Sequence, residues 1–181
     1  MSRAFGILCA VSALMAPACA HAALPAGTKA PAFSTQVAKG GKESGFSLRA
    51  ALRRGPVVLY FYPKAFTKGC TLEAHAFAEA TDDFAKAGAT VIGLSADDIG
   101  TLKRFSTEEC RDKFAVGVAS PAIIKAYDVA LVHENLPSGL TDRTSYVVGK
   151  NGRIVFVHSE LDYRDHVRLT LKAVQDLSAK R

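Results

Sequence analysis

Residues 56–88, PVVLYFYPKAFTKGCTLEAHAFAEATDDFAKAG, contain the two patterns that decide the fold of this chain. The run PVVLYFY is continuously apolar, β-branched and aromatic, which is typical of a central strand buried on both faces. In residues 71–86 apolar side chains recur at helical spacing, at Leu72, Ala76, Ala80 and Phe84. Gly88 predicts the end of this helix. A buried strand therefore leads directly into a helix, and Cys70 lies at the junction.

The rest of the chain continues the alternation of strands and helices. Further strands are expected at 33–37, 89–95 and 116–119, and RTSYVVGKNGRIVFVH (143–158) predicts a hairpin that turns at Lys150-Asn151-Gly152. Helices are expected at 46–55, 97–114, 120–127 and 163–180, with Asp98 as a cap and with Leu102 and Phe105 facing inward. Loops are expected in the remainder of 25–45. This order predicts an α/β fold with a mixed central sheet flanked by helices on both faces, and a thioredoxin-like fold fits it.

The first 22 residues differ in kind from the rest of the chain. A short basic start, MSR, precedes the apolar run AFGILCAVSALMA, which is short for a membrane span, and Ala20-His21-Ala22 fits a cleavage site. We therefore expect a signal peptide in 1–22 and one domain in 23–181, exported and most simply periplasmic. A membrane anchor and a lipid attached to Cys19 are the alternatives.

Cysteine count and charge narrow the range of functions. Cleavage would remove Cys9 and Cys19 and leave one pair, Cys70 and Cys110, in a compartment where disulfides persist. The 181 residues are 49% hydrophobic, which suits one ordinary core. The net charge of +6 is scattered along the chain without a basic stripe, so a nucleic-acid partner is not expected.

The position of Cys70 bears on its chemistry. If the helix begins near Thr67, this threonine is a good N-cap and Cys70 is the third helical residue. Free N–H groups and the positive end of the helix dipole there favour a thiolate. Pro63 ends the strand without offering an N–H, and Gly69 lets a ligand approach the backbone. These features leave three alternatives open for Cys70: a nucleophile, a packing residue or half of a structural disulfide.

The spacing Pro63-x-x-x-Thr67-x-x-Cys70 resembles the signature of the peroxiredoxins. The longer run VVLYFYPKAFTKGCTLEAHAF is similar to their Q-type branch, the bacterioferritin comigratory proteins. The resemblance implies a thioredoxin-like fold and a thiol-dependent peroxidase that reduces hydrogen peroxide and organic hydroperoxides without a metal or organic cofactor. By the same resemblance, Cys70 is the peroxidatic cysteine that becomes a sulfenic acid, and Thr67 binds the sulfur and the peroxide. Pro63 shields the sulfenic acid, and Arg143 in RTSYVV fits the place of the family's arginine.

The second cysteine departs from the most common pattern of the branch. Many Q-type members carry it five residues after the first, where this chain has His75, about 140° around the helix from Cys70. His75 is therefore expected to be a bystander, with tuning of the site as the alternative. Resemblance to another subset implies that Cys110 resolves the sulfenic acid as an intramolecular disulfide with Cys70. We expect Cys110 late in helix 97–114 and outside the core, and we expect the first turns of the Thr67 helix to unwind. The alternative is an inert, buried Cys110.

The resemblance also implies a thioredoxin-like reducing protein as partner and a monomeric state. Other functions on the same fold need cysteine patterns that this chain does not match. A disulfide exchanger needs C-x-x-C, whereas Thr71-Leu72-Glu73 follow Cys70, and a metal-binding module needs two close cysteines and a histidine. A non-enzymatic domain held by a Cys70–Cys110 disulfide would leave Thr67 and Arg143 without a role.

Overall fold

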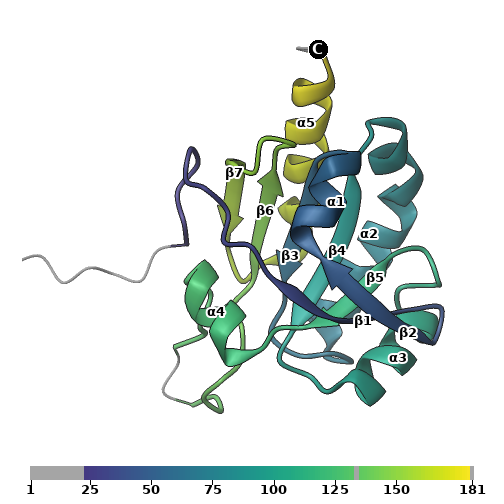
Figure 1. Ribbon diagram of the computed structural model, residues 1–181. Helices are drawn as coiled ribbons and strands as arrows, with labels where there is room; N and C mark the ends of the chain where they lie inside the picture. The colour runs from purple at the N-terminus through teal and green to yellow at the C-terminus, as the bar shows by residue number, and fades with distance from the viewer. Residues whose placement is uncertain (1–22, 133–134, 180–181) are drawn as a thin grey trace, which may run out of the picture.

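The computed structural model describes residues 23–132 and 135–179, so the expected signal peptide lies outside the described residues. A mixed seven-stranded sheet in the order β2-β1-β5-β4-β3-β6-β7 forms the centre of the molecule (Figure 1). The strands are β1 (Ser34–Lys39), β2 (Lys42–Ser47), β3 (Val57–Phe61), β4 (Thr90–Ser95), β5 (Ala115–Val118), β6 (Thr144–Val148) and β7 (Ile154–Ser159). The helices are α1 (Leu48–Arg54), α2 (Lys68–Lys86), α3 (Ile99–Glu108), α4 (Pro121–Tyr127) and α5 (His166–Ala179), the last preceded by a 3₁₀ turn, Tyr163–Asp165.

Strand β3 is the buried centre that the sequence predicted. All five of its residues are buried, and it pairs in parallel with β4 and antiparallel with β6. Its side chains alternate between two cores. Val58 and Tyr60 pack with α2, α3 and α5, whereas Leu59 and Phe61 pack with α1 and α4. The predicted mixed sheet with helices on both faces is therefore confirmed, as is the hairpin of β6 and β7.

Helix α2 is present as predicted and ends where Gly88 takes a positive φ of 77°. The prediction of its buried face is wrong, however. Leu72 is 39% exposed, and Ala76 and Ala80 are only partly buried. The buried face instead comprises Cys70, Glu73, Ala74, Phe77, Ala78 and Phe84. The helix is rotated so that Cys70 and a charged residue face the core, which a purely apolar pattern does not predict.

Strand β2 was not expected. It pairs antiparallel with β1 through a turn at Gly40 and Gly41, both with positive φ, and lies at the edge of the sheet. Its sequence, KESGFS, is mostly polar and exposed, which is typical of an edge strand but also of a loop. The predicted loop therefore forms the second half of a hairpin.

Helix α3 is shorter than expected. Asp98 caps it by accepting a hydrogen bond from the Thr101 N–H, and Leu102 and Phe105 are buried as predicted. The helix ends at Glu108, and the chain then turns through Arg111 and Asp112 with φ of 51° and 58°. No glycine or proline marks this end, so the helix predicted from the sequence extended to residue 114. Cys110 thus lies in a turn after the helix.

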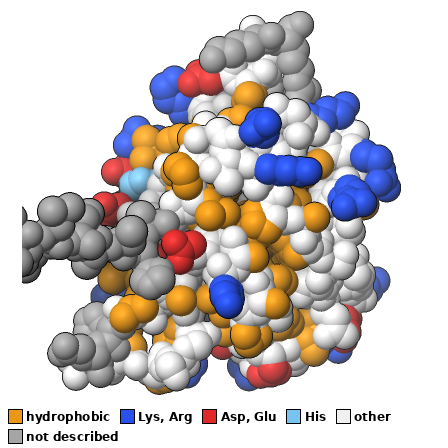
Figure 2. Space-filling view, turned by 60° about the vertical axis from the view of Figure 1, so that its left-hand side comes forward, with side chains coloured by type: hydrophobic (Ala, Val, Ile, Leu, Met, Phe, Trp, Pro, Cys, Tyr) orange, Lys and Arg blue, Asp and Glu red, His pale blue; other side chains and the backbone are white. Residues whose placement is uncertain are grey.

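On the face drawn in Figure 2, charged side chains do not gather into one stripe. Figure 2 shows Lys and Arg side chains as separate groups, mostly in the upper and right-hand part of the face drawn, with apolar side chains between them. Within the described part of the chain, no helix has the length and apolar character needed to cross a membrane.

Gly55 should be the glycine at which adding a side chain lowers the stability of the fold most. A Cβ at this position would collide with the backbone carbonyl oxygen of Gly88, where the entries to β3 and β4 meet. We expect Gly55→Ala to lower the free energy of unfolding by about 1–3 kcal/mol, because the backbone must move to relieve the overlap. Gly45→Ala, whose Cβ meets nothing within 4 Å, should change it by less than about 0.5 kcal/mol. Equal urea midpoints for the two variants would contradict this expectation.

Candidate active site

The N-terminus of α2 positions Cys70. Thr67 is the N-cap by its extended backbone, so Cys70 is the third helical residue, as predicted, and its side chain is buried. The Thr67 hydroxyl does not cap the helix; it donates to the Lys64 carbonyl oxygen at 3.0 Å. The first N–H groups of a helix have no partner within the helix. They and the helix dipole therefore remain available to an anionic sulfur or to a ligand beside it.

The loop between β3 and α2 is held by the neighbouring strand and helix. The Ala65 N–H donates to Asp97 Oδ2 at 2.7 Å, and the Ser95 hydroxyl donates to the same oxygen at 2.8 Å. Phe66 has a φ of 62°, the left-handed conformation that bulky residues rarely adopt. Its ring packs edge-on against Phe105 at 5.3 Å, and α3 thus holds the residue before Thr67 in a strained conformation.

Arg143 reaches Cys70 from β6. Because Thr144 pairs with Phe61 at the end of β3, Arg143 lies where the chain leaves β3 for α2. Its Nη2 is 3.5 Å from Cys70 Sγ, and its Nε donates to the Leu161 carbonyl oxygen at 2.8 Å. The Arg143 side chain is 6% exposed. The structure thus brings together the cation and the thiol that the family resemblance paired.

Glu73 is a site residue that the sequence analysis missed. It lies one turn after Cys70 on the same face of α2, is fully buried, and forms an ion pair with Arg143. Burial raises the pKa of Glu73 to about 8, although Arg143 opposes this rise. A hint was available, since residues three apart share a helix face. Nothing in the sequence, however, showed that this face is buried.

His166 extends the buried polar group at the start of α5. Its Nε2 lies 2.9 Å from the Glu160 carbonyl oxygen, which only accepts, so Nε2 carries the proton. Its Nδ1 therefore accepts from the Ser145 hydroxyl at 2.8 Å. Burial lowers the pKa of His166 to about 4. Nδ1 is also 3.8 Å from Glu73 Oε1, an oxygen with no hydrogen-bond donor among the described residues.

Cys110 is buried, contrary to expectation. Both cysteines are free thiols and belong to the same core cluster. The pKa of Cys110 is raised well above its usual value, chiefly by burial and further by Glu109 and Asp112. In its reduced, resting form Cys110 is therefore a neutral thiol that is shielded from solvent.

His75 contacts the segment around Cys110 instead of Cys70. Its Nε2 lies 2.7 Å from Glu109 Oε2. Two more exposed pairs, Arg111 with Glu79 and Lys113 with Asp82, join α2 to the same segment. His75 thus helps to tie the two cysteine-bearing segments together, and its role as a bystander to Cys70 stays a prediction.

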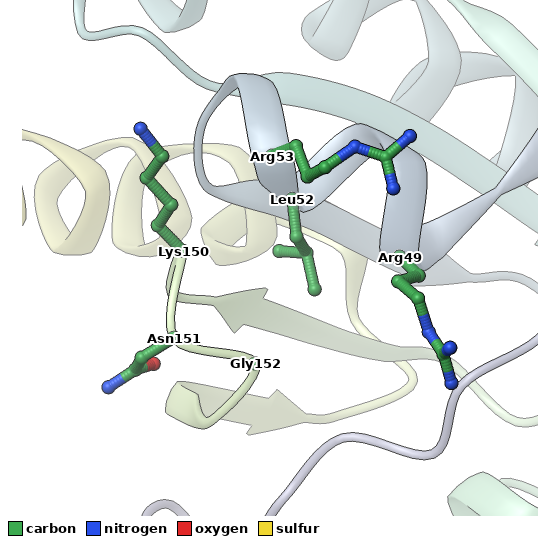
Figure 3. A pocket seen from close by; sticks show the side chains of 6 residues that line it. All are labelled: Arg49, Leu52, Arg53, Lys150, Asn151 and Gly152. Atoms are coloured by element: carbon green, nitrogen blue, oxygen red, sulfur yellow. The ribbon is translucent and has the colours of Figure 1, made fainter.

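A hollow of about 550 Å³ lies away from the thiols, between α1 and the turn that joins β6 to β7. This is the end at which β3 begins, since Val57 pairs with Val148, whereas Cys70 follows the end at which β3 stops. Figure 3 shows that Arg49, Arg53 and Lys150 point in different directions around it. They do not converge on one point, so this hollow does not have the form of a reaction site. No group of three or more His, Cys, Asp or Glu within residues 23–132 and 135–179 could hold a metal ion.

A buried thiol at a helix N-terminus, faced by a buried arginine on a thioredoxin-like sheet, defines a class of cysteine-dependent redox enzymes. The AhpC/TSA family profile matches residues 26–157. Peroxiredoxin Q of rice chloroplasts is 34% identical over 179 residues, which cover 93% of this chain and 81% of the relative. The chain belongs to the AhpC/TSA family and is a peroxiredoxin, a thiol-dependent peroxidase.

Further relatives agree with this assignment. Peroxiredoxin Bcp of Bacillus subtilis is 29% identical over 126 residues, covering 68% of this chain and 80% of the relative. Among solved structures, BcpB of Mycobacterium tuberculosis matches with a TM-score of 0.72 at 26% identity, over 84% of this chain and 97% of its own. Peroxiredoxin Q of Xanthomonas campestris matches with a TM-score of 0.69 at 25% identity, over 79% and 90% of the two chains.

Proposed function

We propose that Cys70 is the peroxidatic cysteine and that Cys110 resolves it within the same chain. The observation that carries the first part is the 3.5 Å approach of Arg143 Nη2 to Cys70 Sγ at the N-terminus of α2. The thiolate attacks one peroxide oxygen, the O–O bond breaks, and Cys70 becomes a sulfenic acid. The departing oxygen leaves as hydroxide or alkoxide and takes a proton to become water or an alcohol.

Arg143 is the group that stabilises this step. A fixed guanidinium favours the thiolate before attack and the negative charge that develops on the peroxide during it. Glu73 and the Leu161 carbonyl hold the guanidinium in place. Thr67 and Pro63 are assigned to the peroxide-binding wall, Thr67 through its hydroxyl and Pro63 through its lack of an N–H.

Resolution is proposed to involve movement, because both cysteines are free thiols buried in the reduced core. A disulfide needs Cα atoms within about 7 Å and matching side-chain directions. We propose that the first turns of α2 unwind and carry Cys70 towards Cys110. The strained Phe66 before α2 and the irregular turn 109–112 after α3 support this route, since neither segment is a regular element. A thioredoxin-type protein then reduces the disulfide.

Mass spectrometry after one equivalent of hydrogen peroxide, without reductant, tests the assignment. We expect a Cys70–Cys110 disulfide within one chain in the wild type, a dimedone-trapped sulfenic acid on Cys70 in Cys110→Ser, and no peroxide consumption by Cys70→Ser. Dimers linked through Cys110, or a lasting sulfenic acid in the wild type, would contradict intramolecular resolution. Peroxide consumption by Cys70→Ser would contradict the role of Cys70.

Residues 1–22 are proposed to be a signal peptide that exports the domain 23–181 to the periplasm, where it acts as a monomer. The basic start, short apolar run and Ala20-His21-Ala22 support export. Amino-terminal sequencing of the protein recovered from the producing cells should begin near Ala23. A chain that begins at Met1, or that sediments as a dimer, would contradict the respective proposal.

A further inference from the structure

Strand β3 presents two buried tyrosines, Tyr60 and Tyr62, to the core that contains both thiols. Both side chains are fully buried, and neither hydroxyl has a hydrogen-bond partner among the described residues. Buried tyrosine hydroxyls normally find one. On the opposite face of the sheet they do, since Tyr127 donates to the Pro31 carbonyl oxygen at 2.7 Å and Tyr146 donates to that of Tyr127 at 2.8 Å. The unpartnered pair is therefore a local feature of the thiol side.

Tyr60 lies between the segments that carry the two cysteines. Its ring stacks on Phe77 of α2 with centroids 4.2 Å apart, and it packs on Phe114 at 5.8 Å, just beyond the turn of Cys110. Tyr62 stacks on Phe105 at 5.5 Å, and the Phe105 carbonyl oxygen accepts the Cys110 N–H at 3.0 Å. The two tyrosines thus pack against the segments that carry both cysteines, within the core cluster that contains the two thiols.

The sheet makes room for the tip of the Tyr60 ring. Gly93 on β4 lies opposite Tyr60 in the parallel pairing, and a Cβ at Gly93 would come within 2.8 Å of the Tyr60 hydroxyl oxygen. Any other residue at this position would displace the phenol. The fold therefore accommodates a hydroxyl that gains no hydrogen bond in the reduced state.

The ionisable groups around this hydroxyl are mainly those of the redox site. Burial raises the pKa of Tyr60 well above its usual value, and Cys110, Tyr62, Glu73 and Cys70 raise it further, in that order. Tyr60 accordingly keeps its proton and is available as a donor. Tyr62 has the Ser95 hydroxyl as an additional polar neighbour. Tyr60 is therefore the clearer example of a buried hydroxyl without a hydrogen-bond partner among the described residues.

We propose that the Tyr60 hydroxyl donates a hydrogen bond to the Cys110 sulfur as this sulfur becomes a thiolate and attacks the Cys70 sulfenic acid. In this step the S–S bond forms, the S–O bond of Cys70 breaks, and hydroxide leaves. The proton lost by the Cys110 thiol converts the hydroxide to water, and Tyr60 keeps its own proton. The inference rests on the proposed pairing of Cys70 with Cys110.

The absence of a partner in the reduced state is what makes this arrangement effective. An interaction that forms only as charge develops accelerates the step, whereas one already present in the ground state does not. A buried neutral thiol resists ionisation, and a phenol in the same core cluster that donates to the sulfur during the attack offsets that resistance. The reduced protein bears the cost as an unsatisfied buried hydroxyl.

Tyr60→Phe tests the proposal, with Tyr127→Phe as the matched control. Both variants are made in protein carrying Cys9→Ser and Cys19→Ser, so that Cys70 and Cys110 are its only thiols. After mixing with hydrogen peroxide, rapid acid quenching and mass spectrometry follow the thiol, the sulfenic acid and the disulfide separately. We expect Tyr60→Phe to slow disulfide formation about tenfold to a hundredfold and to change the rate of Cys70 oxidation by less than about twofold. Tyr127→Phe should leave both rates unchanged.

Two further readouts separate this role from packing. In Tyr60→Phe the half-maximal rate of disulfide formation should shift to higher pH, because the Cys110 thiolate loses a donor. The urea midpoint of the reduced protein should rise in Tyr60→Phe, since an unsatisfied hydroxyl is removed, and fall in Tyr127→Phe, since a bonded one is lost.

The outcomes distinguish this inference from the proposed function. If the wild type forms no Cys70–Cys110 disulfide, the proposed resolution itself fails. If the wild type forms it and Tyr60→Phe forms it equally fast with the same pH profile, only the role of Tyr60 is overturned. Equal slowing in Tyr127→Phe would also overturn it, because the effect would then be one of general packing.

Discussion

Arg143→Gln is expected to lower the second-order rate constant for oxidation of Cys70 by hydrogen peroxide about 10²–10³-fold. The substitution removes the only cation within hydrogen-bonding reach of Cys70 Sγ among the described residues. Losing one preorganised donor to a developing negative charge has an effect of this size in enzyme active sites. Gln keeps a neutral donor of similar length, so the loss measures mainly the charge. Stopped-flow competition for hydrogen peroxide gives the rate constant.

Arg164→Gln is the matched control for this experiment. Arg164 pairs with Asp162 on the surface, close in sequence to the Leu161 carbonyl that holds Arg143. It should leave the rate constant unchanged. Since Arg143→Gln also leaves Glu73 buried without its partner, we expect a loss of about 3–5 kcal/mol in stability. Arg143→Lys retains the charge and serves as the folded companion, with an intermediate rate. A loss of less than about tenfold in folded Arg143→Gln would contradict the assignment.

His166→Gln is expected to make the protein less sensitive to acid. The pKa of His166 in the folded state, about 4, lies below its ordinary value of 6.5. A group with a lowered pKa contributes stability that is present above pH 6.5 and is lost as the pH falls towards 4. This loss is about 3 kcal/mol for a shift of this size. Gln can still donate to the Glu160 carbonyl oxygen but does not titrate.

Urea unfolding at pH 7 and at pH 4 measures this difference. The wild type should lose about 3 kcal/mol more than His166→Gln between these two values. Glu73 acts in the opposite sense, because its raised pKa favours the folded state at low pH and disfavours it as the pH rises from 4.5 towards 8. It is present in both proteins, so the difference between them measures His166 together with its coupling to Glu73. Parallel curves for the two proteins would show that His166 is not buried as a neutral ring.

The sequence predicted the strand and helix that position Cys70, because β3 has a continuous apolar pattern and Thr67 lies three residues before the thiol. Arg143 was found through the family resemblance, since its approach to Cys70 depends on the pairing of β6 with β3. Glu73 was missed because a carboxylate normally indicates an exposed face. Only the long-range contact with Arg143 explains its burial.

The burial of Cys110 could not be predicted from its neighbours in the sequence either. The residues that flank it are charged, and Glu109, Arg111 and Asp112 suggested an exposed helical face. The helix instead ends at Glu108, Arg111 and Asp112 then reverse the chain in the left-handed conformation, and Cys110 is buried in this turn. Backbone reversals of this kind without glycine depend on tertiary contacts, such as the hydrogen bond from the Asp112 N–H to the Ser106 carbonyl oxygen.

The left-handed conformation of Phe66 affects the fraction of molecules in which the start of α2 is unwound. A bulky residue in that conformation raises the free energy of the folded loop by on the order of 1–3 kcal/mol relative to an unstrained one. Every 1.4 kcal/mol removed from the gap between the folded and unwound loop makes the unwound form ten times more common. Under the proposed scheme, Phe66 therefore helps to determine how many molecules have an open α2 terminus at any moment. It also influences the competition for a newly formed sulfenic acid between Cys110 and a second peroxide molecule.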